Sequence, residues 1–308
     1  MVQALKPGNL FWLLPLLLGG CVRGGFHAAS TNEDSFISNS DTGSPDTGSP
    51  DTGSVDASPP HTWAFKDVQA VDVLNSGLGD DDPALPGSML EILFDSNRTG
   101  KGLWRATRTS ITEPWSAPQP IALFSEGSAP SFAQDGLTLH LVVGGDFYRT
   151  TRSEVGGVWA APVALVELNT ADRESALALT SDGLYMVLSR QTSTDTLLAS
   201  SRSTLGEPWS VPQEITELLE ESGGNSSPWL NPTGTMLLFA SNRAGGAGLQ
   251  DIWVATRASR AIPFDAPQPM TSINSAQSEE DPWLSPDGMV LFFARDVGGI
   301  KSLYTAHR

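Results

Sequence analysis

The residues that could do chemistry are carboxylates, and they gather at three points of the chain. Asp80-Asp81-Asp82, Glu174 and Glu279-Glu280-Asp281 each lie just ahead of a turn that joins two apolar segments. Carboxylate oxygens at this density can bind a cation such as Ca²⁺. Two of them, about 5–9.5 Å apart and with one pKa raised, can also hydrolyse a glycosidic bond. The plain alternative is an acidic, solvated surface that keeps the protein soluble.

Other catalytic patterns are missing from the sequence. It contains no Gly-x-Ser-x-Gly motif and no phosphate-binding loop. The histidines lack the spacing of metal ligands, and the single cysteine lies near the N-terminus. The histidines are His27, His61, His140 and His307. No cofactor is therefore predicted, and Ca²⁺ stays open as an alternative.

The segments that must position these carboxylates repeat along the chain. Short runs that end in arginine recur every 44 to 55 residues, and a tight turn such as Asp287-Gly288 precedes them. Glycine tolerates the positive φ of such hairpin turns. An aromatic residue and a proline-containing segment follow all but the last run. The arginines are Arg108, Arg152, Arg202, Arg257 and Arg308, and the aromatic residues are Trp115, Trp159, Trp209 and Phe264.

Each repeat predicts four short strands, which we call a to d. Strand b, for example 236–240, is almost continuously apolar, which suits a strand packed on both faces. Strand d carries prolines, which suits an edge strand. No long segment of 64–308 has apolar residues at helical spacing. Four strands in about 45–50 residues are typical of a propeller blade. We therefore predict an all-β fold, a β-propeller over residues 63–308.

The two ends of this domain predict how the ring closes. Arg308 ends a strand c, so the last repeat lacks a strand d of its own. Residues 65–71 align with the strand d at 115–121. We predict that this N-terminal strand pairs beside the last strand c, which gives five four-stranded blades and no bare edge. The acidic clusters at 80–82 and 279–281 would then be neighbours on one rim.

Several motifs recur at fixed places in the blades. Blade five has Ser285-Pro-Asp-Gly288, and blade four has Ser241-Asn-Arg243 and Asp251-Ile-Trp253, with Thr233 where Asp is usual. This pattern resembles the TolB-type (WD-like, PD-type) β-propeller repeat of bacterial envelope proteins. The resemblance implies the fold. It does not imply an activity, because propellers host both enzymes and binding proteins.

The N-terminus is predicted to be a targeting segment. Residues 10–18 form an apolar stretch too short to span a bilayer, and Gly19-Gly20-Cys21 follow. This segment resembles the lipobox of bacterial lipoproteins, which implies a signal peptide at 1–20 and lipid on Cys21. Two or more acyl chains give stable anchoring. In that family Val22 favours the outer membrane, so we expect an outer membrane lipoprotein that faces the periplasm or the cell surface.

A linker separates Cys21 from the propeller. Residues 21–62 include three copies of Asp-Thr-Gly-Ser, two of them followed by proline. Such a tract cannot bury enough apolar surface to offset chain entropy. We predict a disordered tether between the lipid anchor and the folded domain.

The overall charge limits the partners. The formal charge is −17, which repels nucleic-acid phosphates and argues against a nucleic-acid partner. Our first hypothesis is a non-enzymatic envelope module that binds a protein or another ligand at the mouth of the central channel of the propeller. The alternative is a carbohydrate-active propeller, glycosidase or lectin, that uses the acidic rim. The candidate ligand- or cation-binding residues are Asp80, Asp81, Asp82, Glu174, Glu279, Glu280 and Asp281.

Overall fold

The computed structural model describes residues 63–220 and 223–308. The predicted signal peptide 1–20, Cys21 and the linker 21–62 lie outside the described residues. Within the described part of the chain, no helix has the length and apolar character needed to cross a bilayer.

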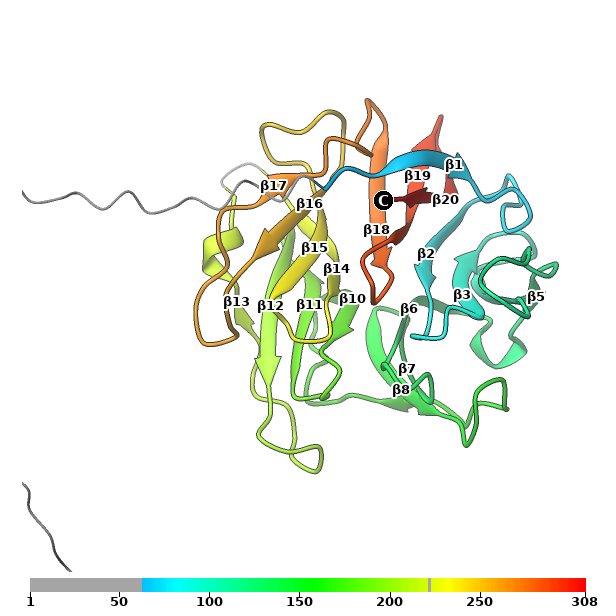
Figure 1. The fold of residues 1–308 in the computed structure, drawn as a ribbon. Coiled ribbons are helices and arrows are strands. Elements are labelled where there is room, and N and C mark those ends of the chain that lie inside the picture. The colour runs from blue at the N-terminus through cyan, green and yellow to red at the C-terminus, as the bar shows by residue number, and fades with distance from the viewer. Residues whose placement is uncertain (1–62, 221–222) are drawn as a thin grey trace, which may run out of the picture. The chain divides into compact units, whose positions relative to one another are not determined.

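The described residues form five antiparallel sheets of four strands each, so the predicted five-bladed β-propeller is confirmed. Figure 1 shows the sheets following one another around the ring. Blade one contains β2 (Asp80–Ala84), β3 (Glu91–Ser96), β4 (Gly102–Thr107) and β5 (Gln119–Pro120). Blade two contains β6 (Gly127–Phe132), β7 (Thr138–Val143), β8 (Asp146–Thr151) and β9 (Val163–Ala164).

The remaining blades follow the same order. Blade three contains β10 (Arg173–Leu179), β11 (Tyr185–Gln191), β12 (Asp195–Ser201) and β13 (Gln213–Glu214). Blade four contains β14 (Asn225–Leu230), β15 (Met236–Ser241), β16 (Asp251–Thr256) and β17 (Gln268–Pro269). Blade five contains β18 (Ser278–Leu284), β19 (Val290–Val297), β20 (Ile300–His307) and β1 (Lys66–Ala70). Two short 3₁₀ helices, η1 (Ala122–Phe124) and η2 (Thr216–Leu218), follow β5 and β13.

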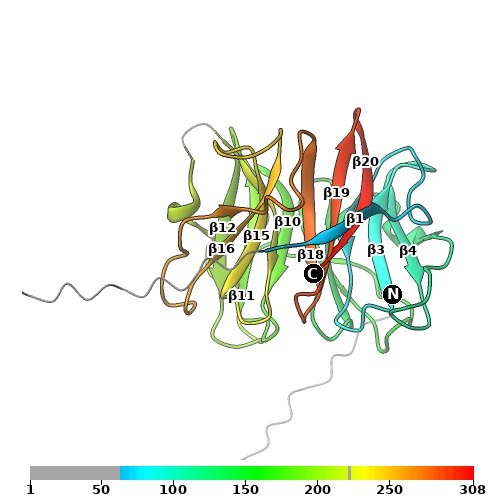
Figure 2. The same cartoon turned by 45° about the horizontal axis from the view of Figure 1, so that its top comes forward.

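The ring closes through the N-terminal strand, as predicted. β1 pairs antiparallel with β20, with Gln69 opposite Thr305 (Figure 2). In blade one Gln119 lies opposite Arg105, the residue after Trp104. Thr305 is likewise the residue after Tyr304, so Gln69 and Gln119 occupy the same position in their blades. The equivalence of 65–71 with 115–121 therefore holds in register. β1 covers the edge of β20 that would otherwise offer unpaired backbone groups.

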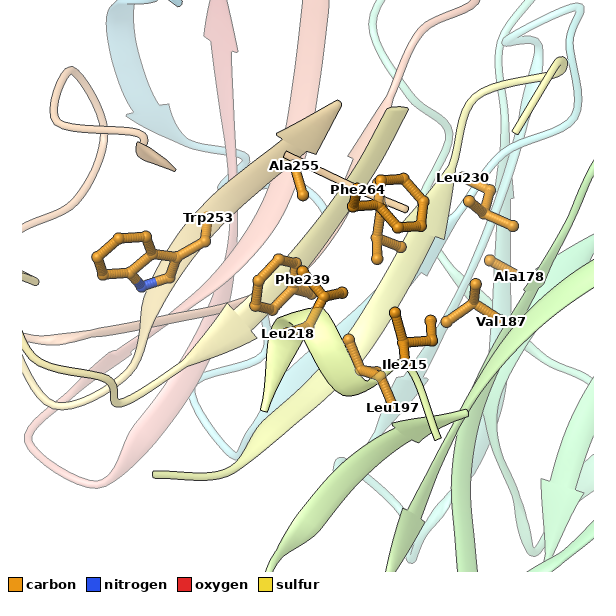
Figure 3. Packing of buried hydrophobic residues seen from close by; sticks show 11 residues of the cluster. Ala178, Val187, Leu197, Ile215, Leu218, Leu230, Phe239, Trp253, Ala255 and Phe264 are labelled. Atoms are coloured by element: carbon orange, nitrogen blue, oxygen red, sulfur yellow. The ribbon is translucent and has the colours of Figure 1, made fainter. Parts of the chain in front are cut away.

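Strand b forms the core because it is covered on both faces. All six residues of β3 are buried, as are five of the six in β15. Side chains alternate between the two faces of a strand, so burial of every residue requires a neighbour on each side. Figure 3 shows one such layer, where Val187 and Leu197 of blade three pack with Phe239 of blade four.

The arginines that end each strand c explain two of the sequence markers. Those of blades two, three and four donate a hydrogen bond from Nε to the turn glycine carbonyl of their own blade, each at 2.8 Å. The guanidinium groups of blades one to four also lie 4.1–4.3 Å from the ring centre of the following aromatic residue. In blade five Arg308 lies over Trp63, at 5.1 Å. These stacks join strand c to the start of strand d.

Candidate functional site

The first acid of each predicted cluster is a structural residue of its own blade. Asp80, Glu174 and Glu279 are fully buried. Each accepts a hydrogen bond from an arginine that lies at the end of strand b or just after it in the same blade. The ion pairs are Asp80–Arg98 at 2.7 Å, Glu174–Arg190 at 2.9 Å and Glu279–Arg295 at 2.7 Å. These three carboxylates therefore lie inside separate blades and do not meet.

The same arginines also donate hydrogen bonds to the loop that precedes strand a of their blade. Arg190 donates to the carbonyl of Leu168, and Arg295 to that of Ile273. In blade four Arg243 binds Asn225 and the Leu218 carbonyl in the same way. Each buried carboxylate is therefore paired with an arginine, and that arginine donates a further hydrogen bond to a loop carbonyl. A buried ion pair is tolerated when it gains such additional hydrogen bonds. Glu174 thus holds a loop in place and is remote from the other predicted acids.

The last acid of the clusters at 80–82 and 279–281 points in another direction because of a bulge in strand a. Asp82 and Asp281 have φ values of 53° and 55°, and the strand pairing shifts register at both places. A left-handed backbone is uncommon for residues other than glycine, but aspartate is among those that adopt it most often. Both side chains reach the wall of a central cavity. Asp82 Oδ2 accepts a hydrogen bond from the backbone of Ala129 in blade two, at 3.1 Å.

Ring closure brings the remaining acids together around one lysine. Lys301 Nζ lies 3.3 Å from Asp81 Oδ2, 3.0 Å from Glu280 Oε2 and 3.6 Å from Asp281 Oδ2. Asp81 belongs to blade one, whereas the other three belong to blade five. Four of the seven predicted residues, Asp81, Asp82, Glu280 and Asp281, therefore gather at the seam where the ring closes.

Sequence reasoning missed two members of this group, Asp95 and Lys301. Asp95 interrupts the apolar run of β3 and lies opposite Asp81 in the sheet. One carboxylate oxygen from each of Asp81, Asp82 and Asp95 lies within 4.8 Å of the others. The charged residue inside an otherwise apolar strand b was the available signal. We call Asp81, Asp82, Asp95, Glu280, Asp281 and Lys301 the seam cluster.

The seam cluster holds more negative charge than its lysine can balance. Burial, and after it the hydrogen bond and charge of the neighbouring Asp81, raise the pKa of Asp95 to about 9. Burial also raises the pKa of Asp82, with added repulsion from Asp281 and Asp81. Burial lowers the pKa of Lys301, but Asp281, Asp81 and Glu280 outweigh it and the net pKa is raised. At pH 7 Lys301 is charged and Asp95 is protonated, since carboxylates this close cannot all ionise.

The cavity at the seam cluster sets a limit on what can enter. It has a volume of about 90 Å³, and Asp82, Asp281, Trp229 and Trp283 form part of its wall. At about 30 Å³ for each water molecule, this holds about three waters. The cavity therefore suits an ion, a few waters or the end of a side chain, and is too small for a sugar ring.

Asp81, Asp82 and Asp95 are the residues that could hold a metal ion. Ca²⁺ takes six to eight oxygen ligands and tolerates irregular geometry, so waters would have to complete its shell. Asp82 and Asp95 would have to release their protons, because metal ligands bind in their ionised form. The nearby ammonium of Lys301 offsets part of the negative charge of these carboxylates.

No known protein family matches this chain, and no curated protein matches it. Solved structures do share its fold. The catalytic domain of a Coprinopsis cinerea GH62 α-L-arabinofuranosidase is 14% identical with a TM-score of 0.53, over 75% of this chain and 90% of that one. An α-L-arabinofuranosidase from Lactobacillus brevis is 12% identical with a TM-score of 0.50, over 78% and 93%. A putative TolB from Agrobacterium tumefaciens is 14% identical with a TM-score of 0.48, over 76% and 78%. At these identities the two arabinofuranosidase structures show a shared fold and nothing about activity.

Proposed function

We propose that this chain is a non-enzymatic binding module of the cell envelope, whose ligand presents a positively charged group to the seam cluster. The ligand class is a protein or peptide with an exposed basic side chain. The strands of the rigid blades hold the seam cluster in place, since its residues lie on β2, β3, β18 and β20. The seam cluster has five carboxylates and one lysine, and this imbalance carries the proposal.

The contacts of Lys301 support this ligand class. Three carboxylates from two blades surround its ammonium group, so the site already binds the kind of group that a lysine ligand would bring. Among the described residues, Asp82 and Asp95 have no ion pair. The side chains of Asp81, Glu280 and Lys301 are 22%, 19% and 29% exposed, so a ligand can reach them from solvent.

Pentalysine is a direct probe of the proposal. We expect the wild-type chain to bind it in about 50 mM salt and Glu280→Gln to bind it roughly tenfold more weakly, a loss of about 1.4 kcal/mol. Glu113→Gln, which removes an exposed carboxylate outside the seam cluster, should bind like the wild type. Fluorescence anisotropy of labelled pentalysine measures the three affinities. Equal affinities in all three proteins would remove the seam cluster as the site.

Lipid anchoring remains part of the proposal. The support is the sequence pattern Gly19-Gly20-Cys21 after an apolar stretch, together with the expected tether at 21–62. In a bacterial host the wild-type chain should partition into the detergent phase of Triton X-114, and Cys21→Ser should stay in the aqueous phase. Detergent partitioning that survives Cys21→Ser would refute attachment at this cysteine.

A second candidate function is carbohydrate hydrolysis, which one observation favours. Asp82 has a raised pKa and lies beside Asp81, so one carboxyl can keep a proton that a glycosidase needs for its leaving group. The two tryptophans in the cavity wall suit sugar stacking, but the cavity volume of about 90 Å³ argues against it. Hydrolysis of 4-nitrophenyl α-L-arabinofuranoside by the wild type, lost in Asp82→Asn, would support this function. Equal rates in both would exclude Asp82 as its acid.

A further inference from the structure

The interface between blades one and two contains a carboxylate held by two arginines. Glu91 at the start of β3 accepts hydrogen bonds from Arg152 Nη2 at 2.6 Å and Nη1 at 3.0 Å, and from Arg105 Nε at 2.5 Å. Arg105 belongs to blade one and Arg152 ends strand c of blade two. Two guanidinium groups that converge on one carboxylate form a strong, geometrically specific site.

The next interface repeats both arginines without the carboxylate. Arg105 lies opposite Leu93 and Arg149 lies opposite His140, so the two arginines occupy the same place in their sheets. Arg202 ends strand c of blade three as Arg152 does in blade two. The position of Glu91, opposite the last residue of strand c, is taken by Thr138 in blade two. A hydroxyl group therefore stands where blade one has its anion.

At the interface between blades three and four, an aromatic residue occupies the position of Glu91. There the equivalent residue is Tyr185, and the guanidinium of Arg257 lies over its ring at 4.8 Å. Among the described residues, the exposed side chain of Arg149 has no hydrogen bond or ion pair. Arg202 uses Nε and Nη1 for the carbonyls of Gly183 and Leu205. The pair of cations between blades two and three thus lacks the carboxylate that Glu91 supplies between blades one and two.

A cavity occupies the space between these two arginines. It has a volume of about 190 Å³, and its wall includes His140, Arg149, Leu165, Arg202 and Trp209. At about 30 Å³ for each water molecule this is the space of about six waters, enough for a small organic acid. His140 is buried, and its pKa is lowered to about 4 by burial and then by repulsion from Arg149 and Arg202. The arginines thus create a positive potential beside the buried His140, although Arg149 itself is exposed and Arg202 is half-buried, so a ligand can enter from solvent.

We propose that this cavity between blades two and three binds a small carboxylate, whose oxygens Arg149 and Arg202 hold as Arg105 and Arg152 hold Glu91. The site is separate from the seam cluster, and its ligand has the opposite charge. Burial lowers the pKa of Arg202 and repulsion from Arg149 lowers it further, and a bound carboxylate relieves that repulsion. Glu167 also lies in the cavity wall, and its negative charge raises the pKa of Arg202. Among the described residues, however, Glu167 and Arg202 do not form an ion pair.

Acetate is the probe that tests the site, with chloride as the matched anion. In urea unfolding of the full chain at pH 7, acetate should stabilise the wild type more than chloride at equal ionic strength, because a ligand that binds the folded state raises its stability. Arg149→Gln should weaken the apparent acetate affinity at least tenfold. Thr138→Glu should remove the acetate response and raise the midpoint without acetate, because its carboxylate takes the place of the ligand.

Matched variants separate this account from its rivals. Arg173→Gln, which removes an exposed arginine from blade three, should respond to acetate like the wild type. An acetate response equal to that of chloride in the wild type would overturn the proposal, as would a response that survives Arg149→Gln. A response that appears only in Glu167→Gln would also overturn it, because the natural occupant would then be Glu167 itself.

Discussion

Asp95→Asn is expected to stabilise the protein at neutral and alkaline pH. The folded pKa of Asp95 is about 9, against an ordinary value near 4, so between these values the folded chain keeps a proton that the unfolded chain releases. The stability that this proton provides is complete below about pH 4 and is lost as the pH rises towards 9. Asparagine needs no proton, and its amide can donate to Asp81. The gain at pH 7 should be on the order of 3 kcal/mol.

Urea unfolding between pH 4 and pH 9 measures this effect. The wild-type and Asp95→Asn curves should meet near pH 4 and separate as the pH rises. Asp172→Asn is the matched control, because Asp172 is exposed and lies outside the strands, just before β10. It should follow the wild type throughout. A loss of stability in Asp95→Asn at pH 7 would mean that an ionised Asp95 contributes favourably, contrary to this account.

Glu91→Gln is expected to destabilise the protein by about 3–5 kcal/mol. Glu91 is 2% exposed and the side chain of Arg152 is fully buried, so the substitution leaves a buried guanidinium without its counter-charge. Burial raises the pKa of Glu91, but hydrogen bonds from Arg152 and Arg105 outweigh it and the net pKa is lowered. Its contribution is therefore present above the unfolded value near 4.3 and is lost as the pH falls through the folded value.

Asp182→Asn provides the comparison for Glu91→Gln. Asp182 of blade three pairs with Arg260 of blade four at 2.6 Å, and both side chains are 37% exposed. Exposed pairs are screened by solvent, so its loss should cost less than about 1 kcal/mol. Urea midpoints at pH 7 measure both variants. If the two substitutions cost the same, burial does not determine the contribution of the pair at Glu91.

The blades could be predicted because their signals are local and repeated. Turn glycines, arginine-ended strands and prolines in strand d each reflect a backbone or packing requirement that recurs in every blade. The closure by 65–71 followed from the same repeat, because the register of Gln69 matches that of Gln119. A repeated pattern constrains each copy through the others, so weak copies such as blade one could still be placed.

The candidate site was only partly predictable, because side-chain direction changes between adjacent residues. Asp80 and Asp82 look alike in sequence, yet Asp80 pairs with Arg98 inside its blade and Asp82 reaches the channel through a bulge. A bulge alters which face a residue occupies, and the strand pattern alone does not reveal it. Lys301 joins the acids only because the ring closes, which brings blade five beside blade one. These contacts depend on three-dimensional geometry at the seam.

The most direct test of the seam cluster is the count of protons released when a cation binds. Asp95 is protonated at pH 7 and the pKa of Asp82 is raised, so a cation at these carboxylates must displace a proton. Calorimetric titration of pentalysine in two buffers with different ionisation enthalpies measures that number. We predict saturable binding with proton release at pH 7, and release of about one proton fewer in Asp95→Asn. Binding without proton release in the wild type, or no saturable binding, would contradict a cation site at the seam.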